Sequence, residues 1–231
     1  MMATLDAVLF DLDGTLLDSA RDFHPIINRL LAEAGRDPIG FDALRSQVSN
    51  GAGAIVAHAF QLEPQAEAFQ ALHRRLLEHY AADLCRHGRL FAGIEPLLSW
   101  LEQMGTPWGI VTNKPQRLSL AVLERLNLSG RCASLVCPED LRSGKPDPEG
   151  LWLACQQLQA KPARCVYVGD HRRDIEAGLA AGMITIAAAW GYLPPDERVE
   201  EWNSHYLALQ PSELQHLLNS LLSQAEPPRP G

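Results

Sequence analysis

Short apolar runs with little polar interruption are the feature that most constrains how this chain can fold. Four of them lie at Ala7–Phe10, Trp108–Thr112, Cys165–Gly169 and Ile184–Ala188, and Ser134–Cys137 is a weaker fifth. Runs of this length that do not alternate apolar and polar residues are typical of parallel strands covered on both faces. They predict a buried parallel sheet.

Helical patterns separate these runs from residue 93 onward. They lie at Glu95–Met104, Leu118–Leu126, Glu149–Leu158 and Arg173–Ala181, and Ser212–Leu222 forms a predicted closing helix with Ser212 as its N-cap. Alternating strands and helices favour βαβ units. The sequence therefore predicts an α/β fold with an open, doubly wound parallel sheet.

Residues 19–88 contain helical patterns and no strand candidate. The patterns cover Ala20–Glu33, Phe41–Val48, Ala54–Phe60 and Ala66–His87. Such a stretch is far longer than the roughly dozen residues that a crossover between parallel strands needs. We therefore predict a helical cap at 19–88, inserted into a core made of residues 1–18 and 89–225. The Pro-rich residues 226–231 are predicted to be a disordered tail.

Charge and composition exclude several classes of function. The formal net charge is −8, whereas a nucleic-acid-binding protein needs a basic surface. No apolar stretch approaches 18 residues, so no membrane association is expected. The five cysteines form no CxxC pair, and the N-terminus lacks the basic segment of a secretory signal, which predicts reduced thiols in the cytoplasm. No feature of the sequence assigns an oligomeric state.

Polar and ionisable side chains follow four of the predicted strands. In open α/β sheets the active groups gather just beyond the carboxyl ends of the strands, so we expect these side chains to meet. They are Asp11 and Asp13 after the first strand, Thr112 and Asn113 after the second, Lys145 in the loop SGKPDP, and Asp170 and Asp174 after Cys165–Gly169.

These residue types suit the hydrolysis of a phosphate monoester. A carboxylate can attack phosphorus and form an aspartyl-phosphate, but an anion that approaches a dianion needs positive charge beside it. Mg²⁺ held by Asp11 and Asp170 would supply that charge, because it accepts a few carboxylates together with water and a phosphate oxygen. The ammonium of Lys145 is a second compact positive charge.

Asp13 has its own predicted role. In an extended segment residues i and i+2 point to the same side, so this acid can protonate the leaving alcohol and later take a proton from the attacking water. The Thr112 hydroxyl and the backbone N–H groups around Gly14 and Asn113 are predicted to bind the remaining phosphoryl oxygens.

The motifs in which these residues lie resemble those of the haloacid dehalogenase-like hydrolase superfamily. DLDGT, VTNKP, GKPDP and GDHRRD follow one another in the family's order and cover nearly the whole chain. The resemblance implies a Rossmann-like core with a cap between the first two motifs. It implies that Asp11 is the nucleophile and Asp13 the acid/base, that Thr112 binds phosphate and that Lys145 stabilises charge. It also implies that Asp11, the Asp13 carbonyl and Asp170 bind Mg²⁺, while Asp174 orients a metal-bound water or Lys145.

Within the superfamily, TNKP, KPDP and WGYLPPDE resemble the phosphoglycolate phosphatase-like branch. VTNKPQR, CPEDLRSGKPDPE and GDHRRDIEAG are similar to bacterial N-acetylmuramic acid 6-phosphate phosphatases of cell-wall recycling. The resemblance therefore implies a small phosphorylated metabolite as substrate, either this phosphorylated sugar acid or phosphoglycolate.

Other activities and further site residues remain open from the sequence. A phosphosugar mutase would use the same residues, whereas a dehalogenase does not need Asp13, and a phosphoacceptor receiver domain is about half this length. In the cap, the Gly-rich break VSNGAGA offers Ser49, Asn50 and Gly51 as contacts to the substrate beyond its phosphate, or is a plain loop between helices. His171, Arg172 and Arg173 are predicted to face the solvent or the cap.

Overall fold

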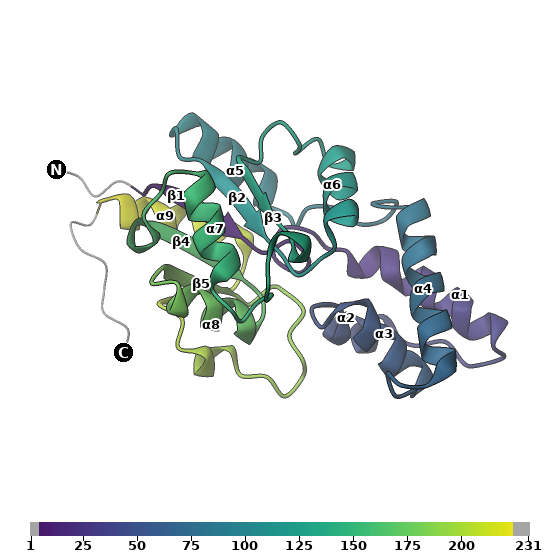
Figure 1. Cartoon of the computed structure of the whole chain (residues 1–231). Coiled ribbons are helices and arrows are strands. Elements are labelled where there is room, and N and C mark those ends of the chain that lie inside the picture. The colour runs from purple at the N-terminus through teal and green to yellow at the C-terminus, as the bar shows by residue number, and fades with distance from the viewer. Residues whose placement is uncertain (1–4, 224–231) are drawn as a thin grey trace.

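A computed structural model of the chain describes residues 5–223. At its centre the described residues form a six-stranded parallel sheet in the order β3-β2-β1-β4-β5-β6 (Figure 1). The strands are β1 (Ala7–Phe10), β2 (Trp108–Val111), β3 (Ser134–Val136), β4 (Cys165–Gly169), β5 (Ile184–Ala188) and β6 (Tyr206–Ala208). The chain steps outward from β1 to β3 and then returns to β4 on the other side of β1, which is the Rossmann order. The predicted α/β fold with a doubly wound sheet is confirmed.

The central strand β1 explains why the apolar runs do not alternate. Val8 pairs with Trp108 on one side and with Val166 on the other. Val8 and Phe10 point into one apolar core, while Ala7 and Leu9 point into a second core on the opposite face of the sheet. Since both faces are covered, every residue of the strand is buried.

Helices cover both faces of the sheet. They are α5 (Ile94–Gln103), α6 (Gln116–Arg125), α7 (Glu149–Gln157), α8 (Arg172–Ala180) and α9 (Leu214–Ser223). Leucines of α5 and α9 pack in the core beneath Val8, whereas α7 and α8 contribute to the core beneath Leu9. None of the helices in the described part of the chain is long and apolar enough to cross a membrane.

Four helices between β1 and α5 form a separate group beside the sheet (Figure 1). They are α1 (Ala20–Glu33), α2 (Phe41–Val48), α3 (Gly51–Phe60) and α4 (Glu67–Ala82), and they pack on one another. Their arrangement supports the proposal that residues 19–88 are a cap on a core formed by the flanking segments. We call this segment the cap.

The structure corrects two helix boundaries in the cap. Helix α3 begins at Gly51 rather than at residue 54, and α4 ends at Ala82 rather than at His87. After α4, the carboxylate of Asp22 accepts hydrogen bonds from the backbone N–H groups of Cys85 at 3.0 Å and of His87 and Gly88 at 2.8 Å. These bonds satisfy the N–H groups outside a helix, so the helical pattern does not continue there.

The C-terminal part of the core differs from the prediction in two ways. Strand β6 was missed, because its three residues carry no distinctive pattern and gain their partners only by pairing with β5. Ser212 does not cap α9: it lies inside a short 3-10 helix, Pro211–Glu213, that precedes the α-helix. The predicted tail at 226–231 lies outside the described residues.

Candidate active site

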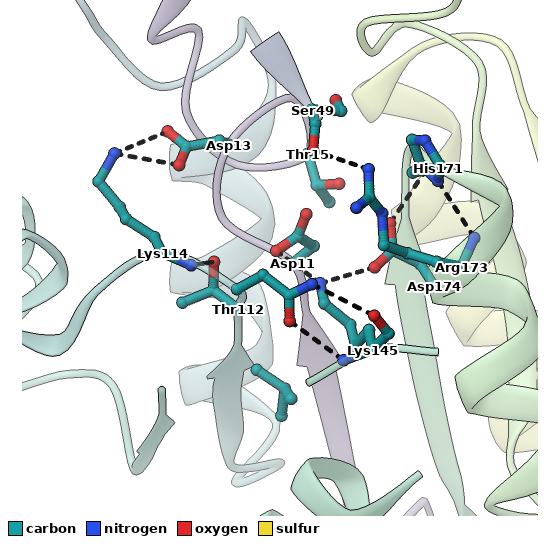
Figure 2. A network of polar contacts seen from close by, with 12 residues as sticks. Asp11, Asp13, Thr15, Ser49, Thr112, Lys114, Lys145, His171, Arg173 and Asp174 are labelled. Carbon is teal, nitrogen blue, oxygen red and sulfur yellow. Dashed lines mark hydrogen bonds and ion pairs between the residues drawn. The ribbon is translucent and has the colours of Figure 1, made fainter. Parts of the chain in front are cut away.

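Of the four predicted groups, Asp170 and Asp174 lie beside Asp11 and Lys145, and the other three groups meet where the carboxyl edge of the sheet faces the cap (Figure 2). They surround a cavity of about 320 Å³ that both parts of the chain line. The core supplies Asp11, Asp13, Thr112, Asn113, Lys114, Lys145, His171 and Arg173, and the cap supplies residues that include Phe23, Ser49, Asn50, Gly51, His73 and Tyr80. The convergence that the sequence predicted at this edge is therefore present.

Lys145 is the cation at the centre of the site. Its ammonium lies 2.8 Å from an oxygen of Asp11, 2.6 Å from an oxygen of Asp174 and 3.0 Å from the hydroxyl of Tyr167. The Asn113 side chain holds the lysine loop in place, because its Oδ1 accepts from the Lys145 N–H at 3.1 Å. Asn113 therefore acts on this loop through its side chain, a role that the sequence did not indicate.

Asp170 is buried and takes part in three hydrogen bonds. It accepts from the Thr15 hydroxyl at 3.1 Å, from the Ser49 hydroxyl at 2.8 Å and from the Tyr192 N–H at 2.9 Å. Gly14 allows this close packing: its φ is +92°, and a Cβ there would lie 2.0 Å from Asp170 Oδ2. The Gly14 N–H donates to the Leu17 carbonyl, so in this structure Gly14 contributes space and not a free donor.

The turn that leads into α8 fixes the hydrogen-bond partners of Asp174 and of the helix N-terminus. His171, and not Asp170, caps the helix, because its Nδ1 accepts from the Arg173 N–H. Asp174 Oδ2 accepts from the His171 N–H at 3.0 Å, which leaves its Oδ1 for Lys145. Asp174 is thus placed to orient Lys145, one of the two roles that the resemblance implied.

Asp11, Asp170 and Asp174 form an acidic cluster whose candidate ligand atoms lie within 4.8 Å of one another. All three are buried, and the single ammonium of Lys145 lies among them. Three carboxylates and one ammonium leave an excess of negative charge away from water, which is unfavourable without a cation. Buried carboxylate oxygens are ligands that Mg²⁺ prefers, so this donor set fits a divalent ion.

The pKa values of the cluster reflect this crowding. Burial raises the pKa of Asp11 to about 6, although Lys145 opposes the rise, and burial with the neighbouring Asp11 raises the pKa of Asp170 to about 7. Burial alone would lower the pKa of Lys145, but the carboxylates of Asp11 and Asp174 outweigh it and raise that pKa. Perturbed groups of this kind gather at functional sites.

Asp13 lies at the same cavity, but its carboxylate does not join the acidic cluster. Both of its oxygens accept from the ammonium of Lys114, at 3.1 and 3.0 Å. That ammonium also donates to the hydroxyl of Tyr80 in the cap, at 2.8 Å. Sequence reasoning missed Lys114 and Tyr80. Lys114 stands inside VTNKP, directly after Thr112 and Asn113, so the motif held the signal, whereas nothing in the sequence marked Tyr80.

Thr112 follows the last residue of β2, is buried and lines the cavity. Its Oγ1 accepts from the Lys114 N–H at 3.2 Å. The Thr112 hydroxyl proton makes no hydrogen bond to another of residues 5–223, which suits the predicted contact with a phosphoryl oxygen.

The cap loop that carries Ser49 and Asn50 is bonded to the core. Arg173 donates to the Ser49 carbonyl at 2.9 Å and to Asn50 Oδ1 at 2.8 Å, and the His171 ring lies 3.2 Å from the same Oδ1. Arg172 turns away and pairs with Glu197. The prediction that these residues of the GDHRRD motif face the solvent or the cap is confirmed.

Comparison with known proteins places this arrangement in a family. Residues 8–188, more than half of the chain, match the family model described as haloacid dehalogenase-like hydrolase. The chain belongs to this family. It is an enzyme of the class of phosphoric monoester hydrolases, as the sequence predicted. This assignment replaces the alternative of a non-enzymatic receiver domain.

Two groups of similar proteins within this family carry different names. The N-acetylmuramic acid 6-phosphate phosphatase of Pseudomonas putida is 43% identical over 218 residues, which are 94% of this chain and 98% of that protein. The phosphoglycolate phosphatase of Xanthomonas campestris pv. campestris is 44% identical over 208 residues, or 90% and 94% of the two chains. A crystal structure from Haemophilus somnus 129pt, described as a predicted phosphoglycolate phosphatase, has a TM-score of 0.83 at 22% identity and covers 94% of this chain and 99% of that one. At this level of identity, the similarity to that structure concerns the fold alone.

Proposed function

We propose that this haloacid dehalogenase-like hydrolase is a Mg²⁺-dependent phosphatase whose substrate is N-acetylmuramic acid 6-phosphate. The observation that carries the proposal is the placement of Asp11 at 2.8 Å from the ammonium of Lys145 and in one cluster with the carboxylates of Asp170 and Asp174. A nucleophilic carboxylate beside one fixed cation and a site for a second is what attack on a phosphate dianion requires.

Asp11 attacks phosphorus, the bond from phosphorus to the ester oxygen breaks, and an aspartyl-phosphate forms. Asp13 gives its proton to the departing sugar oxygen and later takes one from the water that attacks the aspartyl-phosphate, which releases inorganic phosphate and restores Asp11. Lys145 and the Thr112 hydroxyl stabilise the phosphoryl oxygens. Bound to Asp11, Asp170 and the Asp13 carbonyl, Mg²⁺ would supply Lewis-acid stabilisation of the phosphoryl charge.

The size of the cavity supports a sugar acid over phosphoglycolate. Its volume of about 320 Å³ reaches the lower end of the roughly 300–1,000 Å³ range of pockets for drug-sized ligands. A two-carbon acid would leave most of that space unfilled. The cavity is also lined by the apolar side chains of Phe23, Val48, Leu77 and Leu118, which suit the apolar face of a sugar ring.

Phosphoglycolate phosphatase is the second candidate, because relatives of that name match the chain at a similar identity of 43–44%. A side-by-side measurement of kcat/KM for N-acetylmuramic acid 6-phosphate and 2-phosphoglycolate, with Mg²⁺ present, decides between them. We expect the sugar phosphate to be preferred at least tenfold, and a preference for 2-phosphoglycolate would overturn the proposal. If a bisphosphorylated sugar does not stimulate turnover, the enzyme is a phosphatase of one of these two kinds and not a phosphosugar mutase. The composition supports a cytoplasmic location, which we propose along with this substrate.

A further inference from the structure

The ammonium of Lys114 occupies an unusual position in the wall of the cavity. It comes from the loop between β2 and α6, is almost fully buried, and donates to both oxygens of Asp13 and to the hydroxyl of Tyr80. The ring of Tyr80 lies beneath it, with the centroid at 4.5 Å, and Phe23 is stacked on that ring at 4.2 Å. The core lysine is therefore enclosed by two aromatic residues of the cap.

The other cations around the cavity are engaged elsewhere. Lys145 is paired with Asp11 and Asp174 at the phosphate end, and Arg173 holds the Ser49 and Asn50 loop. Figure 2 shows Lys114 and Asp13 on the side of Asp11 away from Lys145. Because Asp13 is the proposed acid for the leaving group, Lys114 lies beside the part of the substrate that departs.

We propose that Lys114 and Tyr80 form a carboxylate subsite that selects phosphorylated acids and releases Asp13 for catalysis. This inference rests on the proposed function of the site. When the substrate binds, its carboxylate takes the place of Asp13 on the ammonium. Asp13, freed from Lys114, takes up a proton from water and turns to the ester oxygen, to which it gives that proton.

The exchange leaves the pairing of the buried ammonium unchanged. One carboxylate replaces another on the buried ammonium, so Lys114 is never left unpaired away from water. Tyr80 accepts from Lys114, and its own O–H has no acceptor among residues 5–223, so it is available to the incoming carboxylate. A phosphate ester without a carboxylate cannot make the exchange and leaves both oxygens of Asp13 on Lys114.

N-Acetylmuramic acid 6-phosphate and N-acetylglucosamine 6-phosphate provide a matched test, because they differ only in the lactyl ether that carries the carboxylate. The ratio of their kcat/KM values measures recognition of that carboxylate. We expect Lys114→Met to reduce the ratio at least tenfold, since a charge-assisted hydrogen bond is lost, and Tyr80→Phe to reduce it roughly threefold. Lys114→Arg, which keeps the charge, should retain most of the ratio.

A second measurement separates binding from chemistry. In the Asp11→Asn background, calorimetry with the same two sugar phosphates should show that Lys114→Met weakens binding of the acid and leaves binding of the carboxylate-free ester within about twofold. A purely structural role for Lys114 would reduce kcat/KM for both substrates by the same factor and leave the ratio unchanged. That result would overturn the proposed subsite. If Lys114→Met does not fold, the kcat/KM ratio of Tyr80→Phe provides an independent test.

Failure of the proposed function would give a different result from failure of the subsite. If the wild-type enzyme prefers 2-phosphoglycolate, the substrate assignment is wrong, and the subsite is then tested with 2-phosphoglycolate against ethyl phosphate. A tenfold loss of that ratio in Lys114→Met supports the subsite with a smaller acid. An unchanged ratio refutes it.

Discussion

The Ser49 hydroxyl of the cap donates to Oδ2 of Asp170 in the core, across a distance of 2.8 Å. Arg173 fastens the same loop by bonding the Ser49 carbonyl and Asn50. The cap thus touches one of the proposed metal ligands directly, and its loop is held over the site by the helix that follows that ligand. This contact links the position of the cap to the acidic cluster.

Replacing Ser49 with Ala should strengthen Mg²⁺ binding several-fold, because the hydroxyl and the ion compete for Asp170. Isothermal titration of the metal-free protein with MgCl₂ measures the change. Ser46→Ala is a matched control, since the Ser46 hydroxyl bonds only partners within the same helix, the backbone carbonyl of Ala43 and the side-chain amide of Gln47. Weaker Mg²⁺ binding in Ser49→Ala would mean that the hydroxyl orients Asp170 for the ion.

Asp11→Asn should reduce turnover at least about 10³-fold while the protein keeps its fold, because an amide cannot form the acyl-phosphate. The midpoint of thermal unfolding should not fall, since the change removes one of three crowded carboxylates. Steady-state kinetics together with circular dichroism test both parts. A variant that retains more than a few per cent of the wild-type rate would remove Asp11 from the nucleophile's role.

Lys145→Met should lower both activity and stability. The substitution leaves Asp11 and Asp174 buried without their shared ammonium, and loss of one partner of a buried ion pair typically costs about 3–5 kcal/mol. Urea unfolding in the absence of metal measures the loss, with the exposed Lys161→Met as control. Equal stability of the two variants would show that the ammonium does not offset the carboxylate charge.

Metal-free protein should be less stable at pH 8 than at pH 5 through Asp170. Burial raises its pKa from 3.8 to about 7, so between these values the folded protein binds more protons than the unfolded chain, and the free energy of unfolding falls as pH rises. His171, whose pKa burial lowers to about 4, gives the opposite slope, so the comparison is made against Asp170→Asn. The stability of the wild type relative to this variant should decline from pH 5 to pH 8 in chelator. A flat difference would contradict the assignment.

Chelation should abolish turnover, and added Mg²⁺ should restore it, because Lys145 alone leaves the acidic cluster with excess negative charge. Activity after extensive treatment with EDTA, followed by titration with MgCl₂, is the measurement. Full activity in chelator would remove the metal from the mechanism.

Local sequence patterns predicted the central strands of the sheet and the helices around them. Every residue of β1 is buried between two covered faces, which is why the run Ala7–Phe10 was recognisable without its partners. Helices α1 and α2 were also recognisable from local pattern, and their bounds agree with the predicted ranges. Polar residues that directly follow such strands must meet at one edge of a parallel sheet, so the group of Asp11, Lys145 and Asp170 could be predicted from order along the chain.

Only the tertiary structure decided which side chains pair. Lys114 bonds Asp13, 101 residues away, and Ser49 bonds Asp170, 121 residues away. No local periodicity carries such contacts, because they depend on how the cap segment packs against the edge of the sheet. Strand β6 was hidden for the same reason, since three residues become a strand only through the neighbour that satisfies their backbone groups.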